Sequence, residues 1–113
     1  MKEIKAYIRN SMVNRVVDAL AQLPDAPAVA VVPLEAFGHG TDSCDYTSVP
    51  VTKVEVDIPD DREEEVLAVI RDNARTGEGH SGDGRILVSD INRALRISDG
   101  REGEPIFRTE SGR

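Results

Sequence analysis

The chain has 113 residues and a mass of 12.3 kDa, a length that fits one domain with a single core. Aromatic residues make up only 4% and tryptophan is absent, so the core must consist mainly of Val, Ile, Leu and Ala, as in helices packed on a sheet. The 21 acidic and 14 basic residues give a formal net charge of −7, which disfavours nucleic acid and anionic membranes as partners but leaves room for a small phosphate ligand beside a few clustered arginines.

The first third of the chain predicts a strand, a helix and a second strand. Residues 4–9 alternate between apolar side chains and side chains that are mostly polar, the pattern of a half-buried strand. Ser11 is a candidate N-cap for a helix whose apolar residues recur at three- and four-residue spacing, and Pro24 ends that helix. A strand over residues 28–34 follows.

A long polar loop and a second strand–helix pair come next. Between residues 37 and 50 the apolar periodicity gives way to Gly, Ser, Thr and Asp, which predicts a loop. Residues 53–58 alternate as a half-buried strand. Asp60 or Asp61 is the candidate cap of a helix that begins with three glutamates and ends near Gly77.

The remaining apolar segments complete a six-element pattern. After a glycine-rich loop, residues 86–88 predict a short strand, and Ser89 is expected to cap a brief helical turn before residues 95–97. The order β-α-β-β-α-β predicts an α+β, ferredoxin-like sandwich in which an antiparallel sheet carries two helices on one face. Because the other face needs cover, we expect a homo-oligomer.

Two features of the sequence predict where the protein is located in the cell and which residues are poorly ordered. Cys44 is the single cysteine, which excludes an internal disulfide, and no N-terminal apolar run follows a basic stretch. We therefore expect a cytoplasmic protein without a signal peptide or direct membrane insertion. Residues 108–113 are almost entirely polar, and we expect them to be frayed.

The second glycine-rich loop is a candidate anion site. Residues 77–82 read G-x-G-x-x-G, but a helix precedes them where the dinucleotide fingerprint needs a strand, and Asp83 stands where a Walker loop has lysine. The glycines of residues 82–85 still free backbone N–H groups to face an anion, and Arg85 adds a cation. The same residues fit a helix C-cap followed by a tight turn, which composition alone favours.

A second set of residues has the chemistry of metal ligands. The candidates are His39, Asp42, Cys44 and Asp45 in the first loop, with His80 from the second. Their spacing matches no standard site, and a solvated loop with an idle cysteine is the simpler interpretation. No Ser-His-Asp set or carboxylate pair can be placed, so nothing in the sequence indicates an enzyme.

Seven short segments, taken together, resemble the PII signal-transduction (nitrogen regulatory protein P-II) family. They are residues 1–6, 36–38, 53–56, 59–61, 74–77, 82–86 and 94–97. They occur in the family's order over residues 1–103, and the segment from Arg75-Thr76-Gly77 to Gly82-Asp83-Gly84 is the most specific part.

The resemblance implies a homotrimer of ferredoxin-like domains formed by residues 1–103, followed by a polar tail at 104–113. It implies a mobile T-loop at about residues 38–50 and a B-loop at residues 76–85. It also implies a regulatory protein that is not an enzyme, binds an adenine nucleotide (ADP, AMP or ATP) in clefts between subunits and controls a partner protein, with a membrane transporter as one candidate. The residues that would bind the nucleotide are Gly38, Lys53, Thr76, Gly77, Gly82, Asp83, Gly84, Arg85 and Arg96.

The chain departs from the family at several of these positions. Arg85 replaces the usual lysine and keeps its charge, whereas Ala36 and Gly40 replace a glycine and a glutamine. Ser98 replaces a second phosphate-binding arginine. We therefore expect ADP or AMP to be favoured over ATP, and we do not expect 2-oxoglutarate as a ligand.

The alternative function is a metal-responsive trimeric binding module related to metal tolerance or efflux. In that case His39, Cys44 or His80 would bind the metal. An enzyme is the third hypothesis, without named catalytic residues.

Overall fold

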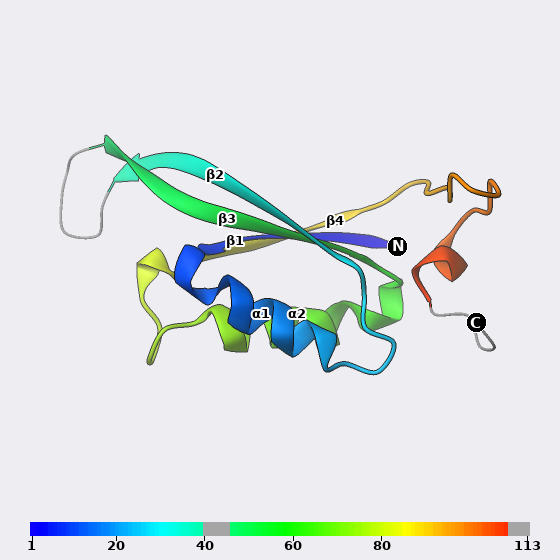
Figure 1. The fold of residues 1–113 in the computed structure, drawn as a ribbon, viewed down its shortest axis with the longest axis horizontal. Helices are drawn as coiled ribbons and strands as arrows, with labels where there is room; N and C mark the ends of the chain where they lie inside the picture. The colour runs from blue at the N-terminus through cyan, green and yellow to red at the C-terminus, as the bar shows by residue number, and fades with distance from the viewer. Residues whose placement is uncertain (40–45, 109–113) are drawn as a thin grey trace.

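The protein, described here from a computed structural model of residues 1–39 and 46–108, is a two-layer sandwich (Figure 1). Its main elements are β1 (Lys2–Arg9), α1 (Val13–Ala21), β2 (Val29–His39), β3 (Tyr46–Ile58), α2 (Glu63–Ala74) and β4 (Gly84–Asp90). The four strands form an antiparallel sheet in the order β2-β3-β1-β4, and both helices lie on one face of it. The expected ferredoxin-like α+β fold is confirmed.

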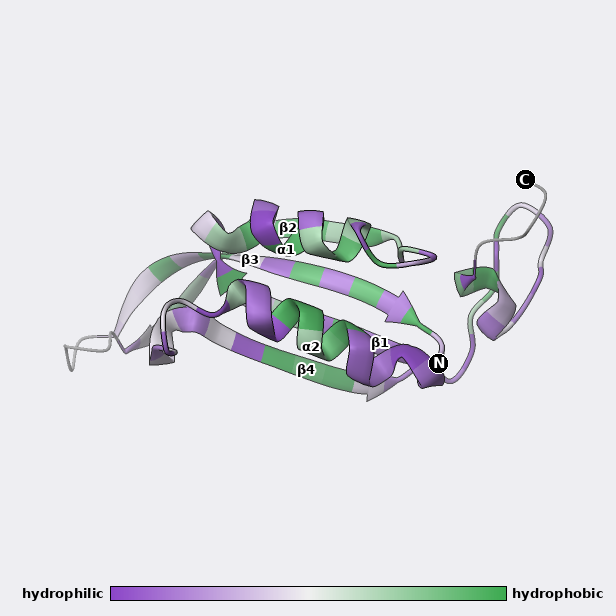
Figure 2. Cartoon of the chain, turned by 90° about the horizontal axis from the view of Figure 1, so that it is seen from below, coloured by the Kyte–Doolittle hydropathy of each residue, from purple (hydrophilic) through white to green (hydrophobic). Residues whose placement is uncertain are grey.

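The core lies between the two helices and the central strands. Hydrophilic and hydrophobic residues alternate along the strands (Figure 2), because successive side chains of a strand point to opposite faces. The helix-facing side chains of β1 and β3 meet Val16 and Leu20 of α1 and Val66 and Ile70 of α2. The central side chains are at most 2% exposed: Ile4, Ala6, Ile8, Val54, Val56, Ile58, Val16, Leu20, Val66 and Ile70.

Both helices begin differently from the sequence-based expectation. Each is preceded by a 3-10 turn, Asn10–Met12 before α1 and Asp60–Arg62 before α2, and no side chain caps either helix. Ser11 was expected to be an N-cap and lies inside the first turn instead. Asp60 and Asp61 likewise lie inside the second turn. A 3-10 turn supplies i to i+3 hydrogen bonds at a helix start, so a capping side chain is not required.

Strands β2 and β3 continue beyond the body of the sheet as a two-stranded ribbon. Pairing of β1 with β3 ends at Val51, whereas pairing of β2 with β3 continues to His39 opposite Tyr46. The loop predicted between residues 37 and 50 is therefore wrong for 38–39 and 46–50, which are strand. Cross-strand pairing overrides the weak strand propensity of Gly38 and Pro50. Residues 40–45 are outside the described part of the chain.

The segment after β4 forms an irregular hairpin in place of the predicted helical turn. Ser89 lies within β4, so its expected role as a cap is wrong. Leu95 pairs with Glu102, and backbone N–H groups of residues 96 and 100 donate to carbonyl groups across the turn. We call residues 92–103 the C-terminal hairpin. It is followed by the 3-10 turn Glu104–Phe107.

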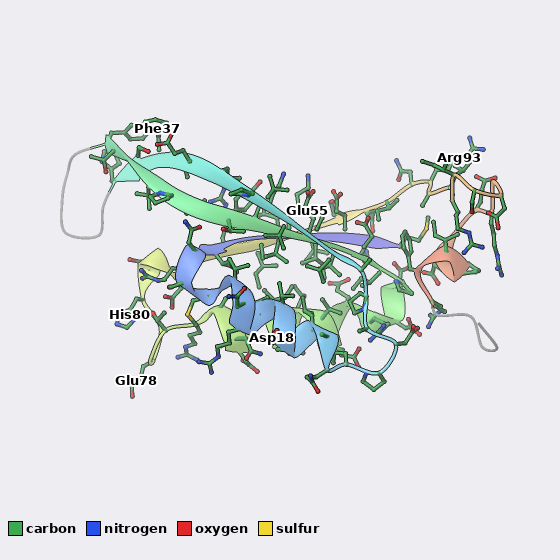
Figure 3. All side chains as sticks on the ribbon, in the orientation of Figure 1. Asp18, Phe37, Glu55, Glu78, His80 and Arg93 are labelled. Atoms are coloured by element: carbon green, nitrogen blue, oxygen red, sulfur yellow. The ribbon has the colours of Figure 1, made fainter. Side chains whose placement is uncertain are left out.

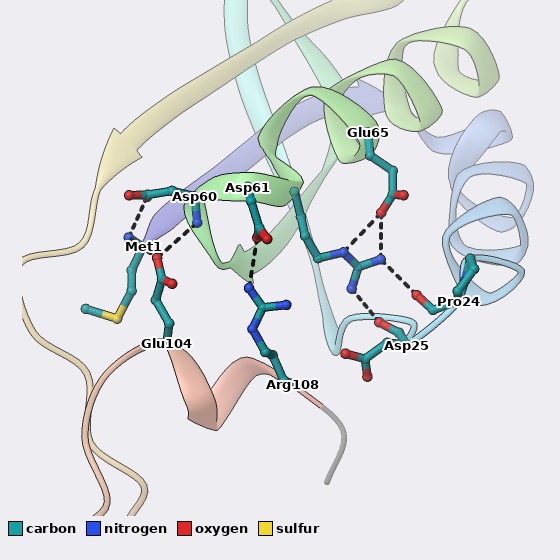
Figure 4. Close-up of polar contacts among 9 residues, drawn as sticks. Met1, Pro24, Asp25, Asp60, Asp61, Glu65, Glu104 and Arg108 are labelled. Carbon is teal, nitrogen blue, oxygen red and sulfur yellow. Dashed lines mark hydrogen bonds and ion pairs between the residues drawn. The ribbon is translucent and has the colours of Figure 1, made fainter. Parts of the chain in front are cut away.

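Arg62 joins the α1–β2 connection to the start of α2. Its guanidinium donates to the carbonyl oxygens of Pro24 (2.9 Å) and Asp25 (2.5 Å) and to the carboxylate of Glu65 (2.7 and 3.0 Å). Figure 4 shows these contacts beside the ion pair of Arg108 with Asp61. The Arg62 side chain is only 11% exposed, so it holds in place a connection in which Asp25 has a positive φ of 50°.

The face of the sheet away from the helices is not covered by any described element, and we call it the open face. It combines ion pairs between Lys5 and Glu3 (3.4 Å) and between Lys53 and Glu55 (3.9 Å) with partly exposed apolar residues such as Leu87. Within residues 1–39 and 46–108, no helix is long and apolar enough to cross a membrane.

Candidate functional site

The loop of residues 75–85, between α2 and β4, is organised around the carboxylate of Asp83. One oxygen accepts hydrogen bonds from the Thr76 hydroxyl and from Arg9 Nε (3.0 Å). The other accepts from the backbone N–H groups of Thr76 (3.0 Å) and His80 (2.9 Å). Both carboxylate oxygens are thus engaged inside the protein, and the side chain is 14% exposed.

These contacts keep Asp83 ionised. The hydroxyl of Thr76 and the backbone N–H groups of His80 and Thr76 hold the pKa of Asp83 well below its usual range, and Arg9 adds to the effect. The negative charge of Asp83 is therefore balanced by hydrogen-bond donors of the protein itself. Asp83 organises the loop, and its oxygens are not free to receive a ligand.

Two glycines allow the loop to lie directly against β1. Gly84 has φ +109°, and a Cβ at this position would lie 1.7 Å from the carbonyl oxygen of Tyr7. A Cβ on Gly82 would lie 2.8 Å from Arg9 Nη2. The close approach at Gly84 requires glycine because only glycine combines this backbone conformation with the absence of a side chain.

His80 is held by the start of the same loop. Its Nδ1 lies 2.8 Å from Thr76 Oγ1 and 3.0 Å from the Thr76 carbonyl oxygen. Because the Thr76 hydroxyl already donates to Asp83, both oxygens face His80 as acceptors, so Nδ1 carries the proton. Arg75 donates to the carbonyl oxygen of Glu78, which closes the outer turn that Figure 3 shows between Glu78 and His80.

On the open face, the loop adjoins two cations and an aromatic ring. The strand register places Tyr7 between Lys53 of β3 and Arg85 of β4. The Arg85 guanidinium carbon lies 4.3 Å from the centre of the Tyr7 ring, a cation–π contact. Arg9, two residues farther along β1, points to the same side. Arg9, Arg85 and Lys53 therefore lie on the same face of three neighbouring strands, near the end of the loop.

The remaining candidates for nucleotide binding are located elsewhere in the chain. Gly38 lies in the ribbon opposite Thr47, with nothing within 4 Å of the position of a Cβ. Arg96 lies in the C-terminal hairpin, where Nη2 pairs with Asp99 at 3.0 Å. This hairpin and the loop of residues 75–85 are at opposite ends of the sheet (Figure 1). One chain alone does not bring Arg96 to the loop.

Sequence reasoning did not identify Arg9 as part of this site, and it did not recognise the internal role of Asp83. Arg9 reads as the last polar residue of a strand pattern, and only the β1–β4 register shows that it reaches residue 83. The signal for Asp83 was weak, since an acidic residue between two glycines is also a common turn residue.

The two candidate metal ligands that the structure describes, His39 and His80, lie in different parts of the fold. His39 lies at the end of the ribbon with its ring edge-on to Tyr46 at 5.4 Å, and His80 is held by Thr76. Asp42, Cys44 and Asp45 lie outside the described residues. In the described ranges no group of three His, Cys, Asp or Glu side chains could hold a metal ion, so the structure does not favour the metal-responsive alternative.

Comparison with known proteins gives one consistent result. Residues 1–101 match the family model described as "Nitrogen regulatory protein P-II". The chain is 34% identical over 103 residues to the "Nitrogen fixation nifHD region glnB-like protein 1" of Methanococcus maripaludis, covering 86% of this chain and 93% of that protein. It is 32% identical over 111 residues to the "Nitrogen regulatory protein P-II" of Bradyrhizobium diazoefficiens, covering 91% and 96%, and equally similar to that of Rhizobium meliloti.

Proposed function

The chain belongs to the nitrogen regulatory protein P-II family, and on this premise we propose that it binds an adenine nucleotide at the loop of residues 76–85 and thereby controls a partner protein. Proteins of this family are regulators rather than enzymes. Binding of the nucleotide would change the affinity of the protein for its partner.

The observation that carries the proposal is the organisation of the loop by Asp83. Its four hydrogen bonds fix the backbone on both sides of the turn. Gly82, Gly84 and Arg85 remain exposed at the surface. An anion that meets a loop already ordered in this way loses less binding free energy to ordering, and backbone N–H groups beside glycines suit phosphate oxygens.

The cations beside the loop support a nucleotide with one or two phosphates. Arg85, Lys53 and Arg9 lie on the same side of the sheet, and their charges complement a phosphate group. Ser98, in the position of a second phosphate-binding arginine by resemblance, has no charge to offer a third phosphate. We therefore propose ADP or AMP as the preferred ligand over ATP.

Assembly would complete the site. Arg96 belongs to the C-terminal hairpin, which lies at the other end of the sheet from the loop of its own chain, so a second copy must supply Arg96 if it contacts the nucleotide. The open face, with its mixture of ion pairs and apolar side chains, offers a surface for self-association. We propose a trimer of roughly three times the chain mass by closed symmetry. Multi-angle light scattering tests it, and a monomer that persists at high concentration would remove the shared site.

The ribbon of β2 and β3 is the proposed contact with the partner. It extends from the body beside Lys53, so a ligand that contacts Lys53 would lie next to the base of the ribbon. Phe37 and Tyr46 are 61% and 67% exposed on it, and exposed aromatic side chains are frequent at protein interfaces. A membrane transporter is one candidate for the partner.

Isothermal titration calorimetry with ADP, AMP and ATP tests the nucleotide proposal. We expect saturable binding at micromolar to millimolar concentration, with ATP the weakest of the three. Combined Arg85→Ala and Arg96→Ala substitution should abolish it, because two of the proposed phosphate-binding cations are then lost.

The matched control is Arg93→Ala, which removes an exposed arginine of the same C-terminal hairpin whose partner is Glu102. This control should bind ADP as the parent protein does. Absence of binding by the parent protein to all three nucleotides at millimolar concentration would eliminate nucleotide sensing and leave the fold assignment intact.

A further inference from the structure

A separate cavity lies on the helix side of the loop of residues 75–85. Its volume is ≈ 380 Å³, which is within the range of small-molecule sites, about 300–1,000 Å³. Apolar side chains of Ile8, Ala74 and Ile86 line it, and Arg71, Arg75, His80 and Ser81 complete the lining.

The cavity and the proposed nucleotide site lie on opposite sides of the sheet. Ile8 and Ile86 point toward the helices, since Ile8 belongs to the core and Ile86 packs against it. Tyr7 and Lys53 point to the open face, one residue out of phase with the core positions. Gly84 and Arg85 also line the cavity. The end of the loop therefore separates the cavity from the proposed nucleotide site.

The charged groups around the cavity select for an anion. Arg71 and Arg75 contribute two guanidinium groups, and Asp83 is the single carboxylate in the lining. Arg85 also lines the cavity, but its guanidinium lies over Tyr7 on the open face. The charge of Asp83 is already engaged by four hydrogen bonds. His80 directs its Nδ1 proton to Thr76. The net charge of the lining is therefore positive.

From this geometry we infer a second binding site, contained within one chain, for a small organic anion with an apolar body. The apolar side chains would cover the body of such a ligand, while Arg71 and Arg75 would pair with its charged group. The cavity shares Asp83, Gly84 and Arg85 with the proposed nucleotide site, but Arg71 and Arg75, which would bind the anion, are not part of that site.

Phenyl phosphate is the probe, since it joins an aromatic ring to a dianion, and chemical shifts of backbone amides in the full chain are the readout. We expect saturable shifts centred on residues 74 and 86. Inorganic phosphate alone and benzyl alcohol alone should each bind more weakly, because the first lacks the apolar body and the second lacks the charged group. Arg71→Glu, on the exposed side of α2, should weaken phenyl phosphate binding at least about tenfold through charge reversal.

Arg15→Glu is the matched control, because Arg15 is an exposed arginine of α1 that does not line the cavity. It should retain phenyl phosphate binding. Equal weakening in the two variants would show a general effect of net charge and overturn the inference, as would the absence of saturable shifts. Competitive displacement of phenyl phosphate by ADP would also overturn it, by placing the probe in the nucleotide site.

Discussion

Replacing Gly84 with alanine tests how closely the loop approaches the central strand. The added Cβ would lie 1.7 Å from the Tyr7 carbonyl oxygen, half the 3.4 Å at which ordinary van der Waals contact begins. The backbone at residue 84 also has φ +109° and ψ −158°, a conformation that costs a non-glycine residue about 1–3 kcal/mol. Strands β1 and β4 must separate at this end, losing a ladder hydrogen bond that contributes about 1 kcal/mol.

We therefore expect Gly84→Ala to lower the free energy of unfolding by about 2–4 kcal/mol, the sum of these two costs. Urea unfolding followed by circular dichroism measures it, at one fixed protein concentration because self-association shifts apparent stability. Weakened ADP binding should accompany the loss, since Gly84 belongs to the proposed site.

Substitutions at two other glycines distinguish the cost of backbone strain from the cost of steric overlap. Gly100 has φ +71° and open space around a Cβ, so Gly100→Ala should cost only the strain of about 1 kcal/mol. Gly38 has open space and no positive φ, so Gly38→Ala should change stability by less than about 0.5 kcal/mol. If Gly84→Ala were no more destabilising than Gly100→Ala, the close approach to Tyr7 would be refuted.

The other predictions concern charged side chains. Arg62→Ala should lower the free energy of unfolding by about 2–3 kcal/mol through lost charged hydrogen bonds to two carbonyl groups, whereas the exposed Arg108→Ala should cost less than about 1 kcal/mol by the same urea assay. Because the pKa of Asp83 is depressed on folding, its stabilisation is full above the ordinary pKa of 3.8 and is lost as the pH falls toward the folded value. Asp83→Asn should therefore flatten the acid side of the stability profile, and an unchanged profile would contradict the hydrogen-bond network. Desolvation and two neighbouring glutamates, Glu3 and Glu55, raise the pKa of Asp57, so Asp57→Asn should increase stability at neutral pH in thermal unfolding, and a decrease would contradict this reasoning.

The sheet and its helices could be predicted from the sequence because each has one buried face. Period-two alternation in β1 and β3 and the three- and four-residue spacing in α1 follow directly from burial on one side. The ribbon could not be predicted in this way, since both of its faces are largely exposed and residues 46–50 show no alternation in burial. Its strands depend on cross-strand pairing, from His39 opposite Tyr46 to Glu35 opposite Pro50, which the residue pattern of either strand alone does not reveal.

The candidate site was predictable in composition but not in the roles of its residues. Glycines and a cation between a helix and a strand indicate an anion-binding loop. That Asp83 faces inward and that Arg9 reaches it depends on the register between β1 and β4, which the local sequence does not reveal. The separation of Arg96 from the loop is likewise a property of the whole fold.

The ribbon also has a mechanical consequence. Strand β3 runs without a break from Tyr46 to Ile58, and its first five residues extend past the last pairing with β1 at Val51, a reach of roughly 16 Å at 3.3 Å per residue. The ribbon is therefore held at one end only, where it joins the core. Thr52, one residue inside that end, is 5% exposed and donates a hydrogen bond to Asn10, so the base of the ribbon is fixed to the body of the protein directly beside Lys53.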